Sequence, residues 1–90
     1  MSAAQTAATA SMSDKARSIF AFAAYYALLS GDPVREVVLD DGQGHHADAD
    51  GVKELQSAGL IEPQGAKARL TDEGQAVLGK VIAAIRGVDA

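Results

Sequence analysis

Hydrophobic residues gather in four clusters along the chain, at residues 19–29, 34–39, 52–61 and 70–85. Within the first cluster, apolar residues recur at the three- and four-residue spacing of one helix face: Ile19, Phe22, Ala23, Tyr26 and Leu29. A second apolar stripe adds Phe20, Tyr25 and Leu28. A helix that is apolar on most sides is buried by several neighbours or by a partner chain.

The first helix is predicted to begin after Ser13, which suits the N-cap, with Asp14 in its first turn. It is expected to run to about Ser30, because Gly31 is a plausible stop and Pro33 cannot continue a helix. Residues 34–39 are rich in valine, which favours a strand over a short helix. Residues 40–48 form a loop by composition.

The last third of the chain has the clearest pattern of breaks. Asp48 or Asp50 can cap a helix that ends at Gly59, and a short strand follows at residues 60–61. Pro63 and Gly65 then reverse the chain into a second strand that ends at Leu70.

A final helix is expected to start at the cap residue Thr71 and to end at Gly87. Its apolar face comprises Val77, Leu78, Val81, Ile82 and Ile85. The pattern as a whole predicts a mainly α fold with a small β-wing: three or more helices and a two- or three-stranded antiparallel sheet.

Ninety residues suffice for one domain, which we place at residues 13–90. Residues 1–12 carry no charge and no apolar periodicity, so we expect a disordered tail there. The longest apolar run, residues 19–29, is about half of the roughly 20 residues that a membrane span requires. The chain has no cysteine, which excludes disulfides and fits a soluble cytoplasmic protein.

The segment from Leu55 to Gly74 resembles the winged-helix regulators of the MarR and PadR type. The matching pieces are Ala58-Gly59-Leu60-Ile61-Glu62-Pro63 and Leu70-Thr71-Asp72-Glu73-Gly74. The resemblance implies a recognition helix near residues 50–58, a wing tip at residues 65–68, and a non-enzymatic role in DNA binding and transcription regulation. It also implies dimerisation through terminal helices.

On that reading, Lys67 and Arg69 touch the DNA backbone, since they share one side of the wing strand. The polar residues able to reach base edges are Lys53, Gln56 and Ser57. Charge opposes this reading: eight Lys and Arg face twelve Asp and Glu, giving a net charge of −4. Carboxylates at Asp48, Asp50 and Glu54 would repel phosphates from the same helix.

The alternative is an acidic protein-interaction module that does not bind DNA. Its contact would be the loop at residues 40–50, through Asp40, Asp41, Asp48 and Asp50. A homodimer is a further expectation, through the helix that carries Phe20, Phe22, Tyr25 and Tyr26.

His45 and His46 lie among these carboxylates, where imidazole could ligate a metal or titrate near neutral pH, although a solvated polar loop is the simpler interpretation. No pattern for a catalytic nucleophile, a metal or a cofactor stands out, so we expect no enzyme.

Overall fold

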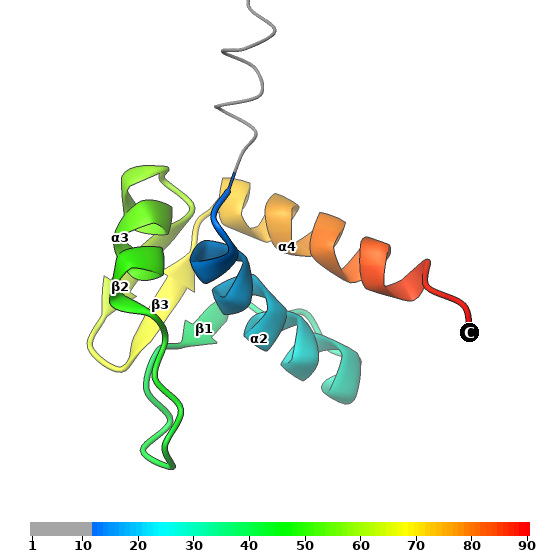
Figure 1. The fold of residues 1–90 in the computed structure, drawn as a ribbon, viewed down its shortest axis with the longest axis horizontal. Coiled ribbons are helices and arrows are strands. Elements are labelled where there is room, and N and C mark those ends of the chain that lie inside the picture. Colours follow the sequence, from blue (N-terminus) through cyan, green and yellow to red (C-terminus); the bar gives the residue numbers. More distant parts are fainter. Residues whose placement is uncertain (1–11) are drawn as a thin grey trace, which may run out of the picture.

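The computed structural model describes residues 12–90. Its elements are α2 (Asp14–Ser30), β1 (Glu36–Val38), α3 (Ala49–Ser57), β2 (Ile61–Gln64), β3 (Lys67–Leu70) and α4 (Asp72–Arg86) (Figure 1). The disorder predicted for residues 1–11 lies outside the described residues. The prediction was wrong for Met12, which is half-buried and packs against the core.

The expected fold class is confirmed. In the described part of the chain, three helices accompany a three-stranded antiparallel sheet with strand order β1-β3-β2. The pattern also located the elements: residues 34–39 contain β1, and β2 and β3 form the ribbon between the second and third of these helices. The arrangement is winged-helix-like, with one departure. A loop joins β1 directly to α3, where a helix-turn-helix would carry another helix.

Short-range hydrogen bonds set the helix ends. The Ser13 hydroxyl accepts a bond from the Ala16 N–H at the start of α2. Of the two candidate caps for α3, Asp48 is the one used, and its carboxylate accepts from the Gly51 N–H. At the other end of α3, Gly59 adopts a positive φ of 74°, which lets the Leu60 N–H bond back into the last turn.

The β2–β3 hairpin is tighter than expected. Its turn consists of Gly65 and Ala66 alone, so Lys67 and Ala68 of the predicted wing tip belong to β3 instead. Gly65 has a φ of 67°, which supplies the left-handed conformation that a two-residue hairpin turn needs.

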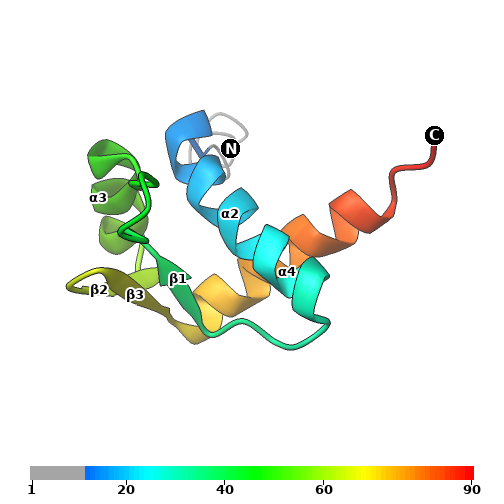
Figure 2. The ribbon, with the colours of Figure 1, turned by 90° about the horizontal axis from the view of Figure 1, so that it is seen from below.

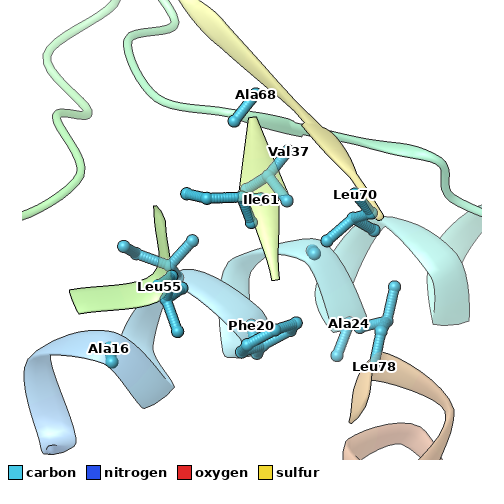
Figure 3. Packing of buried hydrophobic residues seen from close by; sticks show 11 residues of the cluster. Ala16, Phe20, Ala24, Val37, Leu55, Ile61, Ala68, Leu70 and Leu78 are labelled. Carbon is cyan, nitrogen blue, oxygen red and sulfur yellow. The ribbon is translucent and has the colours of Figure 1, made fainter. Parts of the chain in front are cut away.

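The core lies between α2 and the inner face of the sheet. Figure 3 shows the ring of Phe20 between Leu55 of α3 and Leu78 of α4, with the side chains of the three strands beyond it. The fully buried members of the core are Ala16, Phe20, Ala23, Ala24, Val37, Leu55, Ile61, Ala68 and Leu70, each at most 1% exposed. Since α2 packs against both other helices and β1, it is the central element.

The buried face of α2 differs from the predicted one. Besides Ile19 and Phe20 it consists of alanines: Ala16, Ala23, Ala24 and Ala27. Tyr26 and Leu29, assigned to the core stripe, are 40% and 70% exposed, and Tyr25 is 57% exposed. The predicted face of this helix was defined mainly by its large apolar residues. Close packing between neighbouring elements instead favours small side chains at the contact. Figure 2 shows the C-terminal half of α2 lying across α4.

Helix α4 follows its predicted face over its first three turns. Leu78 is buried, and Val77, Val81 and Ile82 pack against the core. The helix then extends away from the domain (Figure 1), so Ile85 is 42% exposed, contrary to expectation.

Two glycines permit the closest backbone approaches. A Cβ at Gly51 of α3 would lie 2.8 Å from the Lys15 carbonyl oxygen of α2. A Cβ at Gly74 of α4 would lie 2.0 Å from the Leu60 carbonyl oxygen, which itself accepts a bond from the Thr71 N–H. The Leu-Thr-x-x-Gly pattern therefore has a steric reason: the first turn of α4 rests on the backbone where β2 begins.

Replacing Gly74 with alanine is expected to destabilise the domain by about 1–3 kcal/mol, because the new methyl group must displace backbone. Gly79→Ala in the same helix is the matched control. It has open space around it, so it should stabilise by about 0.5–1 kcal/mol through helix propensity. Urea unfolding of both variants measures the difference. Equal stability of the two would contradict the close approach.

Candidate functional site

The junction between the starts of α2 and α3 holds Glu54, one of the carboxylates that opposed DNA binding. The Ser13 hydroxyl donates to Glu54 Oε1 at 2.6 Å, and the Ser13 N–H donates to Glu54 Oε2 at 3.0 Å. These two bonds lower the pKa of Glu54 from its ordinary value of 4.5. The Glu54 carboxylate therefore joins α3 to the N-terminus of α2 and does not point away from the domain.

Lys15 pairs with the two carboxylates at the N-terminus of α3, Asp48 and Asp50. Its Nζ lies 3.3 Å from Asp50 Oδ2 and 3.8 Å from Asp48 Oδ2. Both pairs are solvated, so they contribute little to stability. Their effect is local: one ammonium group partly neutralises two carboxylates.

The outer face of α3 carries all three predicted base-reading residues. Lys53, Gln56 and Ser57 are exposed, and at spacings of three and four they share one side of the helix. Leu55 and Gly51 face the core instead.

The wing presents Lys67 and Arg69 on the outer face of β3, while Ala68 and Leu70 face inward. Arg69 is paired with Glu62 across the strands, so its charge is neutralised. Lys67 stands opposite Val38 and Gln64, and has no ion pair within residues 12–90. Figures 1 and 2 both place α3 and the β2–β3 turn at the same end of the molecule, away from the C-terminal end of α4.

The loop at residues 39–48 folds back on itself into a small ribbon of its own, distinct from the β2–β3 ribbon. Asp41 Oδ1 accepts from the Gln43 N–H at 2.7 Å and from the His45 N–H at 2.9 Å. These bonds lower the pKa of Asp41 from its ordinary value of 3.8, so the carboxylate is charged at neutral pH. Figure 1 shows the ribbon projecting from the body of the domain. The structure thus divides the four predicted contact carboxylates: Asp40 and Asp41 in the ribbon, and the other two beside Lys15.

His45 stacks on Phe22 of α2, with the ring centroids 3.7 Å apart and the planes 13° from parallel. His46 Nδ1 lies 3.5 Å from Asp40 Oδ2. The two imidazoles therefore have different neighbours, and residues 12–90 contain no group of three or more histidine, aspartate or glutamate side chains able to hold a metal ion.

The sequence pattern missed an apolar hollow between α2 and the loop. It has a volume of about 470 Å³ and is mostly apolar. Its lining comprises Ser18, Ile19, Ala21, Phe22, Tyr25, Val38, His45, His46 and Ala47. Phe22 and Tyr25 had been assigned to the core or to a dimer face, and the histidines to a solvated loop. No sequence signal shows that they meet, because the contact depends on how the loop folds back.

Of the four aromatic residues expected at a dimer face, the structure leaves three available. Phe20 is fully buried and cannot take part. Phe22 contacts Tyr26 edge to face, and Tyr26 contacts Tyr25.

No protein-family model, curated protein or solved structure matches this chain. Over residues 12–90, none of the helices combines the length and apolar character that crossing a bilayer demands.

We expect the Glu54 contact to give stability a pH dependence. Because the folded-state pKa is lowered, the stabilisation is present above pH 4.5 and is lost as the pH falls through the folded pKa. Glu54→Gln should therefore be less stable than the wild type at pH 7, and the difference should vanish in acid.

Urea unfolding over a pH series measures this effect. Glu36→Gln is the control, because the exposed Glu36 carboxylate makes no recorded hydrogen bond within residues 12–90. A Glu54→Gln deficit that persists unchanged at low pH would contradict the charge-based explanation.

Proposed function

We propose that this protein is a non-enzymatic binding module that contacts duplex DNA through the outer face of α3 and the wing. The observation that carries the proposal is that the carboxylates at the start of α3 and on it have partners at the junction with α2. Glu54 is bonded to Ser13, and Asp48 and Asp50 share Lys15. Lys53, Gln56 and Ser57 are exposed beside them.

The winged-helix-like fold adds support by analogy, because its recognition helix commonly enters the major groove. Lys67 extends the polar surface along β3. With Arg69 engaged by Glu62, the unpaired cations on this surface are few. We therefore expect modest affinity, dominated by phosphate contacts and steeply weakened by salt.

The double variant Lys53→Ala/Lys67→Ala should bind duplex DNA more weakly and with a shallower salt dependence. Each lost phosphate contact lowers the log–log slope by about 0.9, so the expected decrease is about 2. Fluorescence anisotropy of a labelled duplex across a salt series measures it.

Lys80→Ala/Arg86→Ala removes the same charge from α4 and is the control. Both of its residues are exposed, and neither lies on α3 or the wing. The proposal would be overturned if the wild type had no measurable affinity for duplex DNA at low salt. Equal losses of DNA affinity in the two double variants would show that α3 and the wing are not the contact surface.

A second candidate function is contact with a basic protein surface through the acidic loop. It is favoured by the projection of the loop from the domain (Figure 1) and by Asp41, whose pKa is lowered by backbone hydrogen bonds within the loop. Such charges raise association rates and select partners more than they increase affinity.

Replacing Asp40, Asp41, Asp48 and Asp50 together with asparagine tests this candidate. Asparagine keeps the turns and the helix cap, so the fold should persist. The association rate with a partner, captured on the wild type and identified by mass spectrometry, should fall about tenfold or more at low salt.

The matched control replaces Asp14, Asp32, Asp72 and Asp89, all exposed and outside the loop. An unchanged rate in the loop variant, or the same decrease in both, would exclude the loop as the contact.

A further inference from the structure

The sheet has two edges, and they are not equivalent. In β2, the Thr71 N–H bonds to the Leu60 carbonyl, so by antiparallel alternation residues 62 and 64 face β3 and residue 63 faces outward. That outward position is Pro63, which has no N–H to offer. Pro63 therefore removes one of the two outward donor positions of β2, Ile61 being the other, and makes this edge less suited to further pairing.

The edge of β1 is open. Leu70 N–H bonds to the Arg35 carbonyl and Leu39 N–H bonds to the Ala66 carbonyl, so the odd-numbered residues of this strand face β3. The N–H and C=O groups of Glu36 and Val38 then point away from the sheet. No hydrogen bond to them is recorded from any other element of residues 12–90.

The apolar hollow adjoins this open edge. Val38 forms part of its lining, and Ala21, Phe22 and Tyr25 of α2 form the wall beyond. Figure 2 shows β1 running beneath α2. A strand added beside β1 would lie about 4.8 Å away with side chains alternating between the two faces of the sheet. The side chain opposite Val37 would point toward α2 and the hollow, and its neighbours would point to the outer face.

The outer face of β1 carries one exposed carboxylate, Glu36, and Asp40 and Asp41 follow it in the loop. The cross-strand neighbour of Glu36, Arg69, is paired with Glu62 on the far side of β3. A basic side chain placed next to Glu36 by an added strand would therefore be complementary.

We propose that β1 and the hollow bind an extended peptide segment of a partner protein by strand addition. The segment pairs with the backbone of Glu36 and Val38, inserts one apolar side chain into the hollow, and presents a lysine or arginine to the outer face. Backbone bonds supply affinity and the hollow supplies specificity. The inference uses the edge of β1 and the hollow and none of the proposed DNA-contact residues on α3 and β3, and it rests on the protein-contact candidate only in that the partner is a protein.

A phage-displayed library of random linear dodecapeptides, selected on the full 90-residue protein, is the probe. Peptides with an apolar residue next to Lys or Arg should be enriched. A synthetic copy of one should slow amide hydrogen exchange at Glu36 and Val38 at least tenfold. Proline at the peptide position that bonds Val38 should abolish binding.

The variant Ala21→Glu, which places a carboxylate in the hollow, should lose at least tenfold in peptide affinity. Ala76→Glu, at an exposed position on α4, should bind normally. Both variants should bind duplex DNA like the wild type, which separates this inference from the DNA proposal.

Two results of the peptide experiments would overturn the inference. One is that no peptide is enriched on the wild type relative to a parallel selection on the Ala21→Glu variant. The other is a bound peptide that leaves exchange at Glu36 and Val38 unchanged, which would leave protein contact standing without strand addition. Protection of these amides in the free protein, together with a dimer by sedimentation, would assign the edge to a second copy of the chain instead.

Discussion

The small-residue face of α2 is the constraint on which the rest of the structure depends. Both other helices pack on α2, and α3 lies so close that a Cβ at Gly51 would meet the Lys15 carbonyl at 2.8 Å. Phe20 then fills the space beneath the sheet (Figure 3). A small domain buries little surface, so few large side chains must serve several elements at once. Phe20 lies between Leu55 of α3 and Leu78 of α4, with the buried side chains of the strands beyond it (Figure 3).

Close packing at the start of α2 also determines what the domain shows to its surroundings. Because α3 lies beside Ser13 and Lys15, its carboxylates find partners at the junction, and its other polar side chains, Lys53, Gln56 and Ser57, are left exposed. The chain as a whole has a net charge of −4. The exposed ionisable group nearest the centre of the outer face of α3 is nevertheless a cation, Lys53. The net charge of the whole chain therefore does not predict the charge of one surface, because tertiary packing decides which charged side chains that surface exposes.

Replacing a helix by the loop at residues 39–48 has a structural consequence. The loop folds back on itself beyond the end of β1, with Asp40 opposite His46, and His45 stacks on Phe22. An apolar hollow forms between loop and helix, while the neighbouring edge of β1 is left without a partner. The domain therefore has two distinct surfaces: a polar one on α3 and β3, and an apolar one bordered by exposed backbone.

Local chemistry in the sequence determined the elements and their ends. Caps at Ser13 and Thr71, and glycine stops at Gly31 and Gly59, act within a few residues, so the bounds of the helices and the place of the β2–β3 ribbon could be predicted, but not its two-residue turn. The buried face of α2 could not, because residue size in a helix pattern does not reveal how near a neighbour will come. Pairing of Glu54 with Ser13 is likewise a contact across 41 residues. Which side chains share a surface was decided by tertiary packing alone, since only the folded chain brings such distant positions together.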